Sequence, residues 1–186
     1  NGYEHMIDII PDYSIFDRYP MLKEKEYYYS LGSLAPHKNF NWVINQAKFN
    51  PDKLYVVGGG KVSIWKDNIS EDNIPNLLFL GYVSDEENKA LMMKCRAFLH
   101  PSKYEGFGVP PLEALYCGAP LVISKTTCLP EIYEDCAHYF DPDDYLYDIE
   151  LHLNESVGDP QKILKKCNWD KSAQDLYEIF LKNVNE

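Results

Sequence analysis

Short apolar segments that end at glycine alternate with helix-like segments along most of this chain, and this alternation narrows the possible folds most. The segment at residues 27–31 is closed by Gly32, the next by Gly58, and the third by Gly81. Apolar runs of this kind, bounded by turn residues, are typical of strands buried on both faces of a sheet. Five strands are predicted, over residues 27–31, 54–57, 77–80, 97–100 and 121–123.

The segments between these strands carry the spacing of amphipathic helices. Apolar residues within 40–47 fall at positions i, i+3, i+4 and i+7, and Asn39 is placed to cap this helix. Ser84 and Glu87 fit a capping box, and a further helix is predicted over residues 111–116. Strands and helices that alternate in this way form parallel βαβ units. The predicted fold class is α/β, an open doubly wound parallel sheet of the Rossmann-like kind.

Two further helical features are predicted towards the C-terminus. The acidic run at residues 141–144 is interpreted as a capped helix start. A last helix is predicted from about Lys171, with one apolar stripe. That stripe consists of Ala173, Leu176, Tyr177, Phe180, Leu181 and Val184.

Charge and composition exclude several classes of function. Acidic residues outnumber basic ones by 29 to 18, which gives a net charge of −11 at pH 7. Such a surface repels phosphate backbones, so no nucleic-acid partner is expected. No apolar run reaches the roughly 20 residues that cross a bilayer. The five cysteines form no C-x-x-C pair, which indicates reduced thiols and a cytoplasmic location.

The length of 186 residues suits a single domain with a short additional segment. Residues 1–25 contain Pro11 and Pro20 and show no lasting periodicity. They are predicted to be a linker that leads into a domain of residues 26–186. Because the chain opens at Asn1 without an initiator methionine, we expect it to be a segment of a longer protein.

The loop after the fourth predicted strand is the richest in residues that suit a phosphorylated ligand. Doubly wound sheets bind ligands at the carboxyl ends of their strands. In this loop Gly106 and Gly108 have no Cβ, so a ligand can approach the backbone closely. The amides of Phe107, Gly108 and Val109 would lie at a helix N-terminus, which is a favourable site for a diphosphate.

Two glutamates flank this glycine-rich stretch. Glu113, in the first turns of the helix, is placed to accept hydrogen bonds from a ribose diol. Glu105, on the other side of the loop, is placed to hold the hydroxyls of a second sugar ring. The structural alternative makes Glu105 a turn residue and lets Glu113 complement the helix dipole. The spacing alone leaves both interpretations open.

Other candidate sites are weaker. The run Gly58–Lys61 resembles a phosphate loop, but Tyr55 and Val62 break the Walker pattern. These glycines are therefore interpreted as a turn close to the ligand. Three histidines lack metal-ligand spacing and are interpreted as structural: His100, His138 and His152.

The offset from Glu105 to Glu113 resembles the E-x7-E motif of the retaining GT-B glycosyltransferases of family 4, the glycosyl transferases group 1. The flanking segments resemble the family in the same order, and the resemblance covers most of residues 27–144. These segments are residues 31–34 with 38–39, 56–58, 79–83, 129–131 and 140–142. The resemblance implies the C-terminal, nucleotide-sugar-binding half of a GT-B fold.

The resemblance also implies a role for each matching residue. Glu105, as the catalytic residue, would contact the transferred sugar, and Glu113 would bind the ribose hydroxyls. Lys38 would neutralise the phosphates. The donor-binding residues implied are Ser33, Lys38, Tyr82, Val83, Phe107, Gly108, Val109 and Glu113.

One departure from the family pattern concerns the phosphates. Many members carry an arginine where Ser33 stands, so we expect a lower diphosphate affinity unless His37 compensates. A preorganised lysine and amide dipoles stabilise the leaving diphosphate. No metal and no cofactor are then required.

The family resemblance implies transfer of a sugar, with retention of configuration, from a nucleotide-sugar donor to a glycan or lipid-linked acceptor. This activity belongs to polysaccharide or glycoconjugate biosynthesis and needs an N-terminal GT-B domain that this chain is too short to contain. The location implied is cytoplasmic, with peripheral association at the inner face of the membrane. One alternative is a non-catalytic nucleotide-sugar-binding module that acts with a partner chain. Another treats Glu105 and Glu113 as the carboxylate pair of a glycoside hydrolase.

Overall fold

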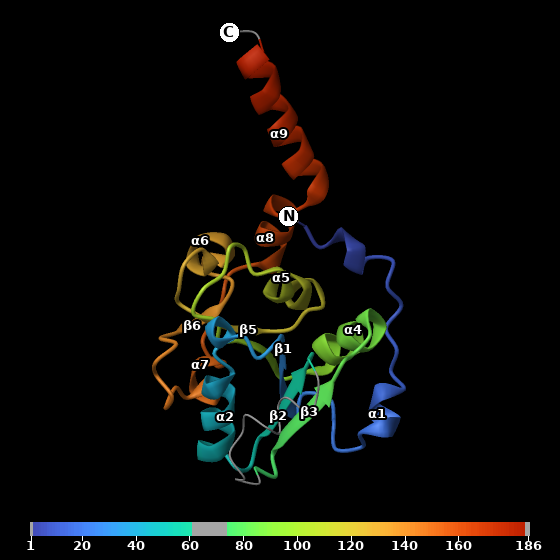
Figure 1. Ribbon diagram of the computed structural model, residues 1–186, viewed down its shortest axis with the longest axis vertical. Helices are drawn as coiled ribbons and strands as arrows, with labels where there is room; N and C mark the ends of the chain where they lie inside the picture. The colour runs from blue at the N-terminus through green and yellow to red at the C-terminus, as the bar shows by residue number, and fades with distance from the viewer. Residues whose placement is uncertain (1, 61–73, 185–186) are drawn as a thin grey trace.

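Parallel strands form one open sheet whose order is that of a doubly wound, Rossmann-like fold. The computed structural model describes residues 2–60 and 74–184 (Figure 1). Within them the strand order is β3-β2-β1-β4-β5-β6, and each neighbouring pair is parallel. The strands are β1 Tyr27–Leu31, β2 Leu54–Gly58, β3 Leu77–Gly81, β4 Ala97–His100, β5 Leu121–Ser124 and β6 His138–Phe140. The predicted fold class is confirmed.

All five predicted strands are present, each within one residue of its predicted bounds. Strand β6 is an addition to the prediction, because its three residues are too few to show a period. Pairing with β5, in which Val122 lies opposite His138, creates this strand. The strand order changes direction between β1 and β4, and the switch point therefore lies between these two strands.

Helices cover both faces of the sheet. Tyr27 and Tyr29 of β1 pack into one core cluster with residues of α4, α5, α6 and α8, while Tyr28 packs into a second with α2 and α7. This alternation buries both faces, as a parallel sheet requires. The helices are η1 Glu4–Met6, α1 Ile15–Arg18, η2 Pro36–Lys38, α2 Phe40–Phe49, α4 Asp85–Lys94, α5 Val109–Tyr116, α6 Leu129–Tyr133, α7 Ile149–His152, α8 Pro160–Lys166 and α9 Trp169–Val184.

Of the three helix caps predicted from the sequence, one is formed and two are not. The capping box of Ser84 and Glu87 is formed at α4. Asn39 precedes α2 but has a left-handed backbone, and its side-chain amide donates to the carbonyl of Pro142 instead of capping the helix. The run at residues 141–144 begins no helix, so that prediction is wrong. Helix α7 starts later, where Asp148 accepts a hydrogen bond from the amide of Leu151.

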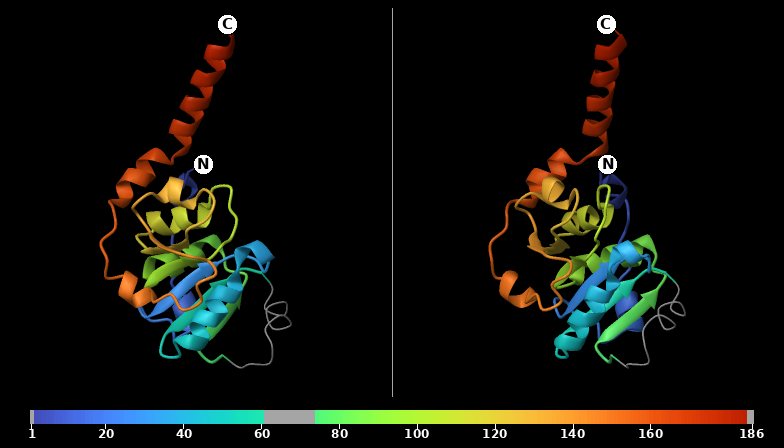
Figure 2. Two further views of the ribbon diagram at one scale, coloured as in Figure 1. Left: turned by 90° about the vertical axis from the view of Figure 1, so that its left-hand side faces the viewer. Right: turned by 60° about the vertical axis from the view of Figure 1, so that its left-hand side comes forward.

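Helix α9 extends away from the rest of the chain, as both views in Figure 2 show. It begins at Trp169, two residues before the predicted start. The predicted stripe is helical, but Leu176, Tyr177 and Phe180 are exposed. Among the described residues, no helix combines the length and the apolar character that a membrane span requires.

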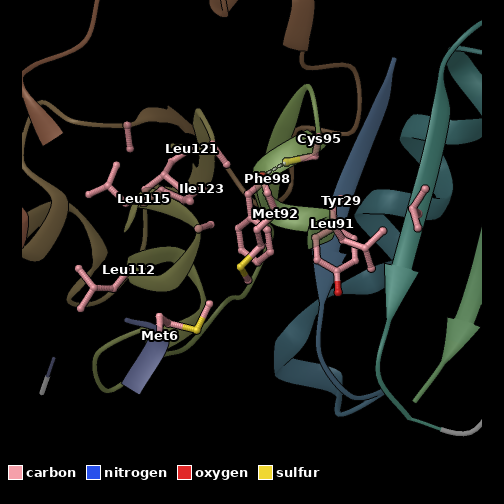
Figure 3. Packing of buried hydrophobic residues seen from close by; sticks show 14 of the residues in the cluster. Met6, Tyr29, Leu91, Met92, Cys95, Phe98, Leu112, Leu115, Leu121 and Ile123 are labelled. Carbon is pink, nitrogen blue, oxygen red and sulfur yellow. Dashed lines mark hydrogen bonds between the residues drawn. The ribbon is translucent and has the colours of Figure 1, made fainter. Parts of the chain in front are cut away.

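The N-terminal segment, residues 2–25, packs onto the face that α4 and α5 cover. Met6, Ile15 and Leu22 are buried in the same cluster as residues of these helices. Figure 3 shows Met6 in that cluster together with Leu112 of α5. Lys89 of α4, which is itself buried, donates hydrogen bonds to the carbonyls of Met6 and Ile9.

Candidate functional site

The loops after β1 and β4 meet at the switch point and are joined through one carbonyl group. The carbonyl oxygen of His37 accepts hydrogen bonds from the Lys103 amide at 2.7 Å and from Ser102 Oγ at 3.1 Å. His37 belongs to η2, which follows β1, whereas Ser102 and Lys103 follow β4. These bonds bring Lys38 to the loop that carries Glu105.

Glu105 is the centre of a partly buried cluster. Its Oε1 accepts hydrogen bonds from Lys38 Nζ at 2.7 Å and from His100 Nε2 at 2.9 Å. The side chain of His100, at the end of β4, is 3% exposed. An ionised carboxylate only accepts, so His100 carries its proton on Nε2 when it is neutral. The structure therefore brings Lys38 and Glu105 into direct contact.

These contacts shift two pKa values in the cluster. Burial raises the pKa of Glu105, but the hydrogen bonds from His100 and Lys38 outweigh it and lower the pKa to about 2. Burial lowers the pKa of His100, against the opposing effect of Glu105. At neutral pH the cluster thus holds an ionised carboxylate and a neutral imidazole. A general acid needs a raised pKa, so Glu105 is suited to accept hydrogen bonds and not to donate a proton.

We expect the stability of Glu105→Gln to change less with pH, in the acid range, than the stability of the wild type. The folded-state pKa of Glu105 is depressed from 4.5 to about 2, so its carboxylate stabilises the fold above pH 4.5. That contribution is lost as the pH falls from 4.5 towards 2. The free energy of unfolding by urea, measured between neutral pH and about pH 3, should fall more in the wild type than in the variant.

A surface variant provides the control for this measurement. Glu155, which pairs with His152 on α7, is exposed, and Glu155→Gln should retain the wild-type pH dependence. An unchanged acid dependence in Glu105→Gln would contradict the assigned pKa shift.

The N-terminus of α5 forms the other half of the loop after β4. Gly108 is the N-cap residue and has φ +83°, a left-handed conformation that favours glycine. The Tyr133 hydroxyl donates to the Gly108 carbonyl at 2.5 Å and holds the turn in place. Phe107 packs partly against the core, and a Cβ on Gly106 would meet nothing within 4 Å. The first amides of a helix have no intrahelical acceptor, which makes those at Gly108 and Val109 candidates for binding an anion, and Gly108 itself is buried.

Glu113 lies one turn into α5, and its carboxylate is already engaged. His5 Nε2 lies 2.8 Å from Glu113 Oε1, and the Glu113 side chain is 13% exposed. No sequence signal points to this contact, because His5 lies in the segment predicted to be a linker. The interpretation of His100 as structural also missed its contact with Glu105. The sequence signal that could have revealed this contact is that His100 lies only five residues before Glu105.

The remaining predicted donor-binding residues lie at the carboxyl ends of β1 and β3. Ser33 is exposed in the loop after β1. Tyr82 follows β3 and is 84% exposed, while Val83 is 8% exposed and belongs to the core. A ligand can therefore meet the Tyr82 side chain, but Val83 can offer little beyond its backbone.

The strand ends beside this loop approach one another closely. The Gly32 amide donates to the Gly58 carbonyl at 3.1 Å, and the Gly59 amide donates to the Gly81 carbonyl at 2.6 Å. Gly59 has φ +96°, and a Cβ there would overlap the carbonyl oxygen of Gly32. The glycines thus form a close bend at the carboxyl edge of the sheet, while Lys61 lies outside the described residues.

The acidic run at residues 141–144 is occupied by local interactions. Asp143 pairs with Lys103, Asp141 accepts from the Asp143 amide, and Asp144 accepts from the amide of Leu146. Across residues 2–60 and 74–184, no three His, Cys, Asp or Glu side chains are grouped in a way that suits a metal ion.

Comparisons with known proteins agree with this architecture. The family model for glycosyl transferases group 1 matches residues 14–146. O-antigen chain mannosyltransferase B of Escherichia coli is 32% identical over 140 residues, which cover 69% of this chain and 36% of the relative. The chain thus spans about a third of that relative's length.

Two solved structures share the fold. Anabaena HepE, in complex with UDP and glucose, superposes with a TM-score of 0.72 at 19% identity, over 91% of this chain and 52% of HepE. Sucrose-phosphate synthase from Thermosynechococcus elongatus superposes with a TM-score of 0.74 at 18% identity, over 97% of this chain and 51% of the synthase. From the extent of the family match, we conclude that this chain belongs to the glycosyl transferases group 1 family.

Proposed function

We propose that this chain is the C-terminal, donor-binding half of a family 4 GT-B glycosyltransferase. The observation that carries the proposal is the cluster of Lys38, Glu105 and the α5 N-terminus at the switch point of the sheet. A cation and free helix amides suit a diphosphate, and a nearby carboxylate suits a sugar. This chain covers only about half of each of the two solved structures, which supports the proposal that it is one half of a two-domain protein.

The proposed reaction is transfer of a hexosyl group from a nucleotide sugar to a glycan or lipid-linked acceptor, with retention of configuration. Mannose is our first candidate for the sugar, because the relative from Escherichia coli is a mannosyltransferase of an O-antigen chain. The acceptor would be held by an N-terminal domain, and the enzyme would work in the cytoplasm, peripherally at the inner face of the membrane. The class of product would be a polysaccharide or glycoconjugate.

The geometry suggests how each group acts in this reaction. Lys38 and the amides of Gly108 and Val109 would stabilise the negative charge that develops on the leaving diphosphate. Glu105, which is ionised at neutral pH, would accept hydrogen bonds from the sugar and favour positive charge on its ring. Glu113 would accept hydrogen bonds from the ribose. No step needs a metal ion or a cofactor, so donor binding should be insensitive to a chelator.

Thermal unfolding with a panel of nucleoside diphosphates and nucleotide sugars tests this proposal. A ligand present at about 100 times its Kd stabilises the folded state by about 2.7 kcal/mol. For a chain of this size the melting temperature should rise by roughly 5 to 10 °C. We expect such a shift with one nucleotide base, and we expect Glu113→Ala to abolish it at the same ligand concentration.

Glu155→Ala is the matched control for Glu113→Ala. Glu155 also pairs with a histidine, His152 at 3.1 Å, but on α7, away from the switch-point loops. This variant should retain the full shift. A panel in which no nucleotide raises the melting temperature, or in which Glu113→Ala retains the wild-type shift, would contradict the proposed donor site.

A further inference from the structure

His5, in the N-terminal segment, contacts Glu113, the residue whose carboxylate we assign to the ribose. His5 Nε2 and Glu113 Oε1 are 2.8 Å apart, although 108 residues separate them in the sequence. A carboxylate only accepts, so the imidazole N–H is the donor. The His5 side chain is 46% exposed and that of Glu113 is 13% exposed. The imidazole is therefore the more exposed partner of a largely covered carboxylate.

The backbone on both sides of His5 is fixed. Lys89 Nζ donates to the carbonyl of Met6 at 2.6 Å and to that of Ile9 at 2.8 Å. Tyr3 stacks on Tyr116 of α5 with ring centroids 4.7 Å apart. The Met6 side chain is buried in the cluster that contains Leu112, the residue before Glu113 (Figure 3). His5 is thus anchored to α5 at the turn that carries Glu113.

We propose that residues 2–10 form one wall of the nucleotide site and that His5 positions Glu113 for the ribose diol. This inference rests on the donor site proposed above. A free glutamate side chain samples several rotamers, and ordering it on binding costs conformational entropy. The hydrogen bond from His5 occupies Oε1, fixes the carboxylate in advance and leaves Oε2 for a ribose hydroxyl. His5 acts through Glu113 and is a positioning residue.

Calorimetric titrations of the 186-residue chain test the proposal, with UDP and GDP each compared with its 2′,3′-dideoxy analogue. We expect His5→Ala to raise the Kd of the ribose nucleotide about tenfold, since hydrogen bonds to charged groups are worth this much or more. The Kd of the dideoxy analogue should change by less than about twofold, because the analogue offers Glu113 no diol. A general loss of folding would affect both ligands equally.

Three further variants separate positioning from a structural role. His5→Gln retains an amide donor and should bind within about threefold of the wild type. His152→Ala removes another partly exposed histidine that pairs with a glutamate, and it should have no effect. In a Glu113→Gln background, His5→Ala should add no further loss, because the carboxylate through which it acts is absent.

The outcomes distinguish this inference from the proposed function. Failure of the wild type to bind UDP, GDP or any other ribose nucleotide of the panel above, or wild-type affinity in Glu113→Gln, would overturn the donor site and the inference together. Loss of affinity in Glu113→Gln with wild-type affinity in His5→Ala would overturn the inference alone. An equal loss for the ribose and dideoxy nucleotides in His5→Ala would also overturn it.

Discussion

Lys38→Ala should weaken binding of the nucleoside diphosphate by about 100-fold, equivalent to about 2.8 kcal/mol. Lys38 Nζ lies 2.7 Å from Glu105 Oε1 and is largely shielded from water, so its charge is screened less than that of a surface lysine. An ammonium group has three donors. The lysine can therefore keep its bond to Glu105 and still contact a phosphate oxygen. Titration calorimetry gives the affinity directly.

Two neighbouring residues provide matched controls for Lys38→Ala. His37→Ala changes an exposed side chain one position away, and Lys103→Ala removes the same charge from an exposed pair with Asp143. Both should bind with nearly wild-type affinity. The corresponding nucleoside, which has no phosphates, should lose no affinity in Lys38→Ala. Wild-type binding by both Lys38→Ala and His37→Ala would contradict the phosphate assignment.

Removal of Lys38 should also affect the free protein. The Glu105 carboxylate would keep His100 as a donor but lose its counter-ion, so stability should fall. Binding must therefore be measured at a temperature at which each variant is folded. With that precaution, the loss of affinity reports on the ligand contact and not on the folded fraction.

The sequence is most informative where local signals agree with the tertiary structure. The strands that end in glycine are predictable because apolar runs and turn residues give the same boundaries. Strand β6 escapes prediction, since pairing with β5 and not its own sequence makes it extended. The acidic run at residues 141–144 resembles a helix start, but Asp141 and Asp144 each accept from an amide two residues later, in turns.

In the candidate site, too, some residues are predictable from the sequence and others are not. Glu105 and Lys38 follow β4 and β1, so topology alone predicts that they lie near each other at the switch point. The sequence does not identify His100 as a site residue, because functional and purely structural histidines at a strand end have the same sequence pattern. His5 is out of reach for a different reason. Its contact depends on how the segment around Met6 packs on α5, and no spacing in the sequence encodes that packing.

A glycine series should show how tightly the carboxyl ends of β1, β2 and β3 are packed against one another. We expect Gly59→Ala to lower the free energy of unfolding by about 3 kcal/mol or more. Its φ of +96° is unfavourable for alanine, and the new Cβ would overlap the backbone oxygen of Gly32, which cannot rotate away. The bond from the Gly59 amide to the Gly81 carbonyl would be strained as well.

Two other glycines separate these contributions in urea unfolding experiments. Gly118 has φ +78°, and a Cβ there would meet nothing within 4 Å, so Gly118→Ala should cost only the backbone strain, about 1 to 2 kcal/mol. Gly106 has open space and no left-handed φ, so Gly106→Ala should change stability by less than about 1 kcal/mol. If Gly59→Ala cost no more than Gly118→Ala, the strand ends could separate easily. The close approach of Gly59 to Gly32 would then not be a constraint on the site.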